Sequence, residues 1–283
     1  MTRAAPDEGV LLTVATATKN AVSSGRFTGL EKCIRSVASL PFPHEHLVRD
    51  GGSRDGTGDA LDRLSREVPD LKVESAPDEG IYDALNGALG AARGEWLLVL
   101  GDDDAIIDAS ALEDMLKASS ARNCDILVTS IALDGGRRIT ARPRLLLGGM
   151  SCPHQGMLVR ISALREIGGF DARYRIAGDY DAFLGLMLGN ARVSRFDRPF
   201  AYFSSGTGIS RDIGACEAEV AAVLSSRLGL SAADRDCRLR NRVLPLRRSI
   251  RFLCHRSPFV RASARWQVAK RMAQLIGLCG VTK

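Results

Sequence analysis

The chain has 283 residues, of which 45% are hydrophobic and 25% charged, a composition typical of a soluble globular enzyme with one large domain or two small ones. No apolar run approaches the roughly 20 residues of a membrane-spanning helix, and seven cysteines without a C-x-x-C pair make a disulfide framework or a zinc site unexpected. The net charge of +6 is uneven, because residues 237–283 hold 12 of the 39 Lys and Arg residues and none of the 33 acidic residues.

Strand-like and helix-like segments alternate along the first half of the chain. Apolar and β-branched runs predict strands at 9–17, 44–50, 71–76, 95–101 and 125–133. Apolar residues at helical spacing predict helices at 28–40, 58–68, 81–92 and 110–121. Thr28 and Glu31 have the spacing of a capping box for the first of these helices. The alternation predicts an α/β fold with a mostly parallel sheet, in which ligands bind beyond the carboxyl ends of the strands.

The pattern is less regular after residue 135. We expect short strands at 137–144 and 156–162, a helix at 179–190, and late strands at 192–197 and 200–205. No repeat or low-complexity linker divides the chain, and residues 231–240 are the candidate boundary before the basic tail.

The segment "DGGSRDGT" (50–57) follows a predicted strand and precedes a predicted helix. Gly51 and Gly52 would let the backbone turn sharply and approach a ligand closely. Asp50 is placed to accept hydrogen bonds from a nucleobase or ribose. The alternative is an ordinary loop in which Asp55 or Thr57 caps the helix.

The segment "DEGIYDALN" (78–86) begins another helix. Asp83 and Asn86 are three residues apart and share one helix face, at an end that suits anions. The alternative is a normal acidic first turn, which is favoured for Asp78 and Glu79.

Three aspartates, Asp102 to Asp104, follow the apolar run 96–100. Burying unpaired adjacent carboxylates is costly, so a cation or water must lie against them. A carboxylate cluster of this kind suits Mg²⁺ or Mn²⁺, whose shell is completed by phosphate oxygens and water. The alternative is a wet acidic turn with Asp104 or Asp108 capping the next helix.

Three weaker motifs follow. His154 and Gln155 lie in "CPHQG", a pair that is most often plain polar structure. Asp179 opens a predicted helix and is either its N-cap or a general base. The last motif is the Gly-rich segment "SSGTGIS" (204–210).

In order and spacing, these segments together resemble the family 2 glycosyltransferases, especially those that build bacterial surface polysaccharides of the colanic-acid type. The resemblance spans about Leu11 to Ser210 and is carried most specifically by "EGIYDALN" and "GEWLLVLGDDD". It implies a GT-A fold over residues 1–230, with a nucleotide-binding half at about 9–135 and an acceptor half at about 136–230. Residues 231–283 would form a basic helical extension.

The resemblance implies an inverting, metal-dependent transfer of a sugar from a nucleotide-diphosphate sugar, most commonly a UDP-sugar, to an acceptor hydroxyl. The acceptor would be a saccharide or lipid-linked saccharide. Asp179 would be the catalytic base, and Asp104 with Asp102 would bind Mn²⁺ or Mg²⁺. The donor-binding residues implied are Thr18, Lys19, Asn20, Asp50, Gly52, Ser53, Asp83, Asn86, Asp102 and Asp103. Those near the diphosphate or acceptor are His154, Gln155, Gly206 and Ser210.

Three positions depart from the family pattern. Arg49 replaces an apolar residue before Asp50, Thr207 separates two glycines, and Asp102 adds an acid where Ala or Ser is common. A non-catalytic nucleotide-sugar binder or scaffold on the same fold is the main alternative, and a nucleotidyltransferase is another. A dinucleotide-binding dehydrogenase is disfavoured because no G-x-G-x-x-G follows the first strand.

The basic segment 237–283 mixes arginines with Leu, Ile, Phe and Trp266. The cysteine pattern fits a reducing cytoplasm, and the composition of this segment suits the surface of an anionic membrane, so one of two equal interpretations is peripheral association with the inner face of the cytoplasmic membrane. The alternative is a helical pair that packs on the acidic body. Nucleic acid is not an expected partner, because no recognised nucleic-acid motif is present.

Overall fold

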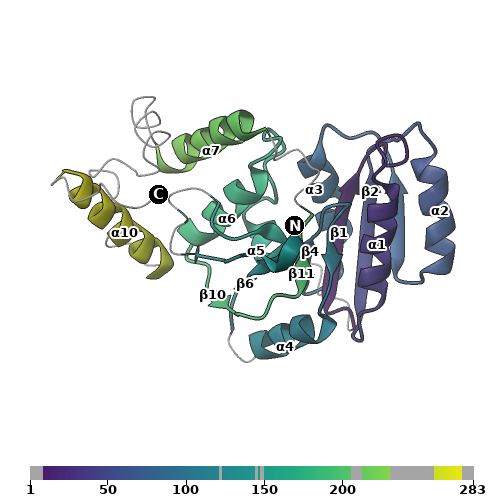
Figure 1. The fold of residues 1–283 in the computed structure, drawn as a ribbon, viewed down its shortest axis with the longest axis horizontal. Coiled ribbons are helices and arrows are strands. Elements are labelled where there is room, and N and C mark those ends of the chain that lie inside the picture. Colours follow the sequence, from purple (N-terminus) through teal and green to yellow (C-terminus); the bar gives the residue numbers. More distant parts are fainter. Residues whose placement is uncertain are drawn as a thin grey trace.

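The structure is a computed structural model that describes residues 9–120, 123–143, 146, 150–204, 212–229 and 258–275 (Figure 1). Its centre is a seven-stranded sheet with the strand order β10-β6-β9-β4-β1-β2-β3. The strands of this sheet are β1 (Leu12–Thr18), β2 (His44–Asp50), β3 (Leu71–Ser75), β4 (Trp96–Val99), β6 (Ile126–Val128), β9 (Met157–Arg160) and β10 (Val193–Arg195). Neighbouring strands are parallel except at β9, which runs antiparallel to both β4 and β6. The predicted α/β class with a mostly parallel sheet is therefore confirmed.

Helices cover both faces of this sheet. They are α1 (Phe27–Ala38), α2 (Thr57–Glu67), α3 (Ile81–Ala91), α4 (Ala109–Ser120), α5 (Ile161–Glu166), α6 (Gly178–Leu188), α7 (Ile213–Leu228) and α10 (Pro258–Leu275). Successive strand residues point to opposite faces, so Val14 and Leu98 pack with α1 and α4, whereas Ala15 and Leu97 pack with α3, α5 and α6. The central strands β4, β6 and β9 are buried on both faces and are accordingly apolar runs, whereas the edge strand β3 is largely exposed.

A second, four-stranded sheet has the order β5-β11-β7-β8. Its short strands are β5 (Ala105–Ile106), β7 (Ile131–Ala132), β8 (Arg138–Ile139) and β11 (Ala201–Tyr202), and 3₁₀ turns lie at η1 (Asp134–Gly136) and η3 (His154–Gly156). The prediction of a single strand at 125–133 is therefore wrong, because these residues form two short strands, β6 in the first sheet and β7 in the second. The break is at Thr129, whose N–H donates to the carbonyl of Gly156 and whose hydroxyl donates to that of Arg198.

Two further predictions are wrong in detail. The helix α1 begins at Phe27 with Arg26 as its N-cap, so Thr28 lies inside the helix and forms no capping box. Glu31 instead pairs with Arg35, one turn on, at 2.8 Å. The strand expected at 156–162 covers only Met157–Arg160, and the helix α5 begins at Ile161.

The helix α10 lies within the basic segment 237–283 and at the opposite end of the molecule from α2 (Figure 1). It contacts α6, and its Val260 and Ala264 are fully buried in the same apolar core as α6 and α7. Across the described ranges, none of the helices is both long and apolar enough to span a membrane.

Candidate active site

The parallel strands β1, β2 and β4 bring three predicted segments to one edge of the sheet. Thr18 and Asp50 end β1 and β2 as register partners, and Asp102 to Asp104 follow β4. The buried carboxylate of Asp50 accepts hydrogen bonds from the Ser53 N–H at 3.1 Å and from the Ser75 hydroxyl at 2.6 Å. Asp50 thus fixes the loop that follows it.

The loops after β1 and β2 are joined to each other. The Asn20 N–H donates to Ser53 Oγ at 2.7 Å, and Asn20 Oδ1 accepts from the Arg54 N–H. Gly52 has a φ of 73°, and a Cβ there would lie 3.2 Å from the nitrogen of Pro77, so the turn requires glycine. Lys19 Nζ lies 3.9 Å from Asp78 Oδ1. The residue set predicted around the nucleoside, Thr18 to Asn20 and Asp50 to Ser53, therefore lies at the ends of β1 and β2 and on the two adjoining loops that follow them.

Asp102 is already engaged by the protein. The Thr18 hydroxyl donates to Asp102 Oδ2 at 2.7 Å, and Arg26 forms an ion pair with the same oxygen. Arg26 also donates to the Lys19 carbonyl at 2.8 Å. Because Oδ2 of Asp102 already has these two partners, less of this carboxylate is left for a metal than the sequence led us to expect. Arg26 was not identified from the sequence, where the only indication of a role is its position directly before α1.

Asp103 and Asp104 differ from Asp102 because each has a buried carboxylate oxygen without a hydrogen-bond partner, Oδ2 of Asp103 and Oδ1 of Asp104. Burial and the neighbouring charges of Asp104 and Asp102 raise the pKa of Asp103 to about 6. Burial also raises the pKa of Asp104, although the nearby His154 opposes this shift. Orphaned carboxylate oxygens in a like-charged cluster fit a hard divalent cation.

The protein side chains alone do not complete a metal site. Within the described residues, no group of three or more His, Cys, Asp or Glu is arranged to hold a metal ion. Mg²⁺ and Mn²⁺ bound by one or two carboxylates normally complete their shells with phosphate oxygens and water. Asp103 and Asp104 fit such a partial site.

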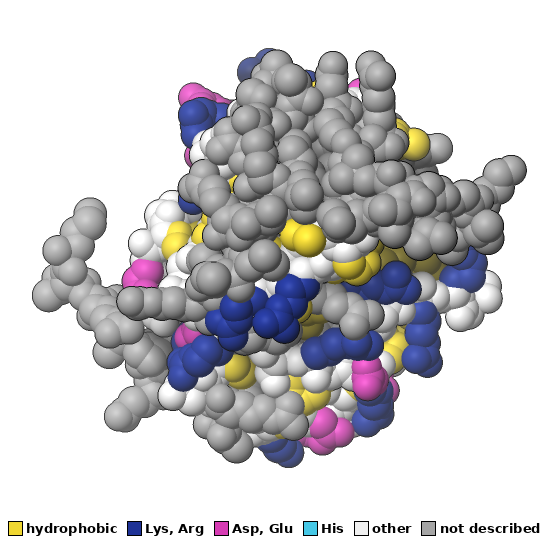
Figure 2. Space-filling view, turned by 90° about the vertical axis from the view of Figure 1, so that its left-hand side faces the viewer, with side chains coloured by type: hydrophobic (Ala, Val, Ile, Leu, Met, Phe, Trp, Pro, Cys, Tyr) yellow, Lys and Arg dark blue, Asp and Glu magenta, His cyan; other side chains and the backbone are white. Residues whose placement is uncertain are grey.

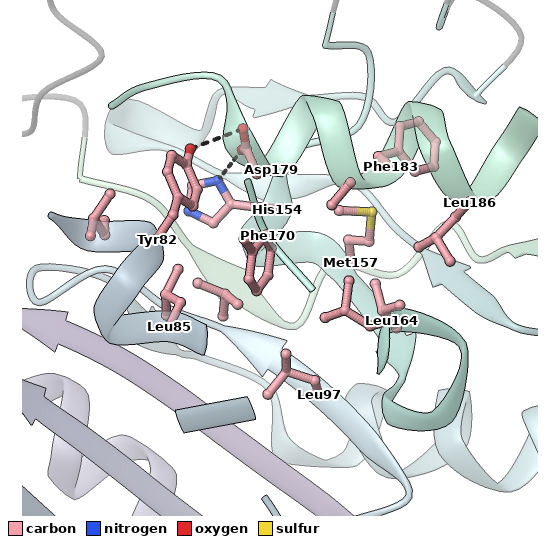
Figure 3. A pocket seen from close by; sticks show the side chains of 14 residues that line it. Tyr82, Leu85, Leu97, His154, Met157, Leu164, Phe170, Asp179, Phe183 and Leu186 are labelled. Atoms are coloured by element: carbon pink, nitrogen blue, oxygen red, sulfur yellow. Dashed lines mark hydrogen bonds and ion pairs between the residues drawn. The ribbon is translucent and has the colours of Figure 1, made fainter. Parts of the chain in front are cut away.

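Asp179 and His154 face one another on the side of the sheet covered by α3 and α6 (Figure 3). His154 Nδ1 lies 3.1 Å from Asp179 Oδ2, while Asp179 Oδ1 accepts from the Tyr180 N–H at 2.7 Å and from the Tyr82 hydroxyl at 3.4 Å. Burial opposes a charge on His154, but the hydrogen bond to Asp179 and the charges of Asp179, Asp104 and Asp103 raise its pKa. The pKa of His154 therefore responds both to Asp179 and to the aspartates at 103 and 104.

Asp179 is not the N-cap of α6. The helix begins at Gly178 with Ala177 as N-cap, so Asp179 lies in the first turn. Tyr82, on α3, was missed by sequence reasoning, although it stands within the motif "IYDALN" beside Asp83. Its hydroxyl also donates to the Ile176 carbonyl at 2.7 Å, which ties α3 to the start of α6.

Asp83 and Asn86, both on α3, make different contacts in the structure. The exposed Asp83 accepts a hydrogen bond from the Glu79 N–H at 3.1 Å at the start of α3. Asn86 uses both ends of its amide on one residue, accepting from the Phe170 N–H and donating to the Phe170 carbonyl, each at 2.8 Å. Asn86 is thus a clamp between α3 and Phe170.

The helix α7 holds the segment that leads to Asp179. The Glu219 carboxylate accepts hydrogen bonds from three successive backbone N–H groups, those of Arg175, Ile176 and Ala177, the last two at 2.7 and 2.9 Å. Arg227 forms a bidentate pair with the buried Asp181, at 2.8 and 2.6 Å. Sequence reasoning missed both residues. Gln155 is buried beside the site in η3, and Gly206 and Ser210 lie outside the described residues.

The model of the family described as glycosyl transferase family 2 matches residues 13–177. A PGL/p-HBAD biosynthesis glycosyltransferase of Mycobacterium bovis is 29% identical over 210 residues, which cover 71% of this chain and 81% of that protein. The chondroitin synthase of Pasteurella multocida is 25% identical over 56% of this chain but only 17% of its own length.

Two solved structures share the fold. S. aureus TarS 1-349 in complex with UDP-GlcNAc has a TM-score of 0.63 at 19% identity, covering 95% of this chain and 92% of that one. The mannosyltransferase PcManGT from Pyrobaculum calidifontis, in complex with GDP-Man and Mn²⁺, has a TM-score of 0.58 at 18% identity, covering 99% and 78%. The chain therefore belongs to glycosyl transferase family 2 and is a transferase with a GT-A fold.

Proposed function

We propose that this enzyme is an inverting, metal-dependent glycosyltransferase that moves a sugar from a nucleotide-diphosphate sugar, preferably a UDP-sugar, to the hydroxyl of a lipid-linked saccharide used in surface polysaccharide synthesis. One observation carries the proposal. His154 contacts Asp179 at 3.1 Å, and the next residue, Gln155, hydrogen-bonds Asp104, so the turn η3 links the proposed base to the proposed cation position. Transfer from a sugar diphosphate requires this adjacency, because the attacked carbon is bonded to the diphosphate.

The donor would lie along the edge formed by the loops after β1 and β2. Thr18 to Asn20 and Asp50 to Ser53 would contact the nucleoside, with Asp83 further along, while Asn86 would support this part of α3 through its hydrogen bonds to Phe170. The neighbours of the same fold are complexes with UDP-GlcNAc and with GDP-Man, which supports a nucleotide-sugar donor. Because Asp50 already binds Ser53 and Ser75, a nucleoside would meet an organised loop.

Asp104 and Asp103 would hold Mn²⁺ or Mg²⁺, with Oδ1 of Asp102 as a further ligand atom. When bound, the ion would neutralise charge that develops on the departing nucleoside diphosphate. His154, whose pKa is raised by Asp179 and by the aspartate cluster, would lie beside the same diphosphate. Arg26 would keep Asp102 from repelling its two neighbours.

Asp179 would act as the base. The acceptor oxygen attacks the anomeric carbon and loses its proton to the Asp179 carboxylate, while the bond from that carbon to the diphosphate oxygen breaks and leaves its electron pair on the diphosphate. Attack from the face opposite the leaving group inverts the configuration. The Tyr180 N–H, the Tyr82 hydroxyl and His154 hold the carboxylate in place for this step.

The basic segment 237–283 would bring the enzyme to an anionic membrane surface, where a lipid-linked acceptor lies. Figure 2 faces the side of the molecule on which α10 lies, and on it Lys and Arg side chains lie across the middle of the described surface with some Asp and Glu side chains among them. The helix α10 buries Val260 and Ala264 against the body but leaves Arg265 exposed. Packing on the body and contact with a membrane are therefore compatible.

The deciding experiment is a thermal-denaturation panel of UDP, GDP, dTDP and CDP, each with Mn²⁺ and with EDTA, on the wild type and on Asp104→Ala. A ligand that binds only the folded state raises the melting temperature. We expect a shift with UDP that requires Mn²⁺ and is lost in Asp104→Ala. No shift with any nucleotide would contradict the proposal, and nucleotide binding without sugar transfer would favour the binding or scaffold alternative.

A further inference from the structure

Arg26 lies against the aspartate cluster (Asp102 to Asp104) and forms an ion pair with its first member. The guanidinium pairs with Oδ2 of Asp102, the same oxygen that accepts the Thr18 hydroxyl at 2.7 Å. The side chains of Asp102 and Arg26 are 8% and 30% exposed, so water screens the pair only in part. The start of α1 also touches the cluster, since a Cβ at Gly29 would lie 3.2 Å from the Asp102 carbonyl oxygen. Oδ2 of Asp102 therefore already has a positively charged partner within the protein.

The charge of Arg26 also acts beyond Asp102. Burial and the charges of Asp104 and Asp102 raise the pKa of Asp103 to about 6, and the charge of Arg26 opposes this rise. When all four groups are ionised, Arg26 reduces the formal charge of the cluster from −3 to −2. A divalent cation at Asp103 and Asp104 would therefore meet a weaker negative potential and would lie near a charge of its own sign.

Other hydrogen bonds hold Arg26 in this position. Its Nη2 donates to the Lys19 carbonyl at 2.8 Å, and its Nε donates to Ser24 Oγ at 3.0 Å. Its backbone N–H donates to the carbonyl of the buried Ala21 at 2.8 Å. A cation could displace the guanidinium from Asp102 only by disturbing these bonds as well.

The turn that carries Arg26 is fixed by the loop after β2. The Val22 N–H donates to Thr57 Oγ1 at 3.1 Å, and the Ser23 N–H donates to Asp55 Oδ2 at 2.6 Å. The guanidinium is thus held in place by contacts that do not involve the aspartate cluster, which lowers the entropy cost of its pairing with the cluster.

We infer that Arg26 withholds Oδ2 of Asp102 from the divalent cation and keeps the affinity of the free enzyme for that cation low, so that the cation is bound firmly only together with the diphosphate of the donor. The inference rests on the proposed function, because it takes Asp103 and Asp104 as the cation position. Diphosphate oxygens are the ligands that such an ion accepts in place of a further carboxylate. Arg26 is thus a positioning residue that makes cation binding depend on donor binding.

The test measures Mn²⁺ binding directly. Free Mn²⁺ is followed by electron paramagnetic resonance while the full-length protein is titrated, without UDP and with UDP. Without UDP, we expect Arg26→Met to bind Mn²⁺ at least about fivefold more tightly than the wild type, because a positive charge is removed and Asp102 is released. Arg26→Lys keeps the charge and should stay within about twofold of the wild type. The double variant Arg26→Met with Asp102→Asn should return to the wild-type affinity, since it releases no carboxylate.

Arg35→Met is the matched control. Arg35 is an exposed arginine of α1 that pairs with Glu31 and Glu67, so its loss should leave the Mn²⁺ affinity unchanged. Arg26→Gln, which also lacks the charge but keeps a hydrogen-bond donor, replaces Arg26→Met if the apolar side chain prevents folding.

The outcomes separate this inference from the proposed function. Equal or weaker Mn²⁺ binding by the uncharged Arg26 variant, in an enzyme whose UDP binding still requires Mn²⁺, overturns the inference and leaves the proposed function standing. Weaker binding would mean that Arg26 only braces the aspartates. Tighter binding that persists in the double variant overturns the role of Asp102. Absence of Mn²⁺ binding by the wild type, with UDP as well as without it, overturns both the inference and the metal dependence of the proposed function.

Discussion

The carboxylate of Glu219, on α7, accepts a hydrogen bond of 2.7 Å from the backbone N–H of Ile176, two residues before α6 begins. It also binds the N–H groups on either side, so a helix distant in sequence fixes the backbone that presents Asp179. A glutamine at this position would offer one acceptor oxygen and a repelling NH₂ group.

We therefore expect Glu219→Gln to lower kcat by roughly 10- to 100-fold, because a misplaced base costs about that much, with little change in the KM for donor. Steady-state kinetics with both substrates varied would show this. Glu217→Gln, an exposed change on the same helix, is the control. An unchanged kcat in Glu219→Gln would mean that α7 does not position the base.

Asp179→Asn should abolish most transfer while leaving nucleotide binding intact. The amide keeps the size of the carboxylate but cannot take the proton, and a positioned base contributes roughly 10²- to 10⁴-fold. Single-turnover transfer and the UDP-dependent thermal shift measure the two properties on one sample. Wild-type turnover would remove Asp179 from the role of base.

Asp102 and Asp104 should respond differently to the loss of their charge. Asp104→Asn is expected to lose Mn²⁺-dependent nucleotide binding, because its buried Oδ1 has no protein partner. Asp102→Asn should keep that binding but lose roughly 1–3 kcal/mol of stability, since it leaves Arg26 without its charged partner. Thermal denaturation with Mn²⁺ and with EDTA distinguishes the two variants. Equal loss of metal dependence in both would make Asp102 a full ligand.

The buried His46 should make the fold sensitive to acid. Burial, and then the neighbouring His44, lowers the pKa of His46 to about 3, against an ordinary value of 6.5. The unfolded chain therefore binds one more proton than the folded protein between about pH 6.5 and 3, so the free energy of unfolding decreases by about 1.4 kcal/mol for each pH unit by which the pH is lowered through that window. His46→Gln should remove this part of the slope in urea titrations from pH 7 to 4, and parallel curves for wild type and variant would contradict the assignment.

The basic segment should give the full chain an affinity for anionic vesicles. Flotation with vesicles of phosphatidylcholine alone and with added phosphatidylglycerol tests this, and binding should weaken as salt screens the charges. Arg265→Glu, an exposed change on α10, should reduce flotation. Failure to float with either vesicle would leave packing on the body as the role of the segment.

The sequence predicts the site best where the candidate functional residues come at or directly after the end of a regular strand. Apolar runs reveal β1, β2 and β4, and parallel strands deliver their carboxyl ends to one edge, so Thr18, Asp50 and the aspartates could be placed together in advance. The separate use of Asp102 could not be foreseen, because it depends on Arg26, which the fold brings from the start of α1.

Long-range polar contacts account for the other differences. Thr129 breaks the run 125–133 through bonds to Gly156 and Arg198, partners that no local pattern reveals. Asn86 was expected at the donor but binds the backbone of Phe170, 84 residues away. The helix α7 has small and polar residues on most of its turns, so its apolar face at Val220, Val223 and Leu224 gives only a weak periodic signal.

The burial of Val260 and Ala264 beside α6 has a consequence for the order in which this protein can mature. Synthesis proceeds from the N-terminus, and the strands β1 to β4 with their helices can pair as soon as they leave the ribosome. The helix that carries Asp179 must wait much longer for its last apolar neighbours, which arrive only with α10. During that interval the loops after β1 and β2 can already form, while the core shared with the helix that carries Asp179 still lacks Val260 and Ala264.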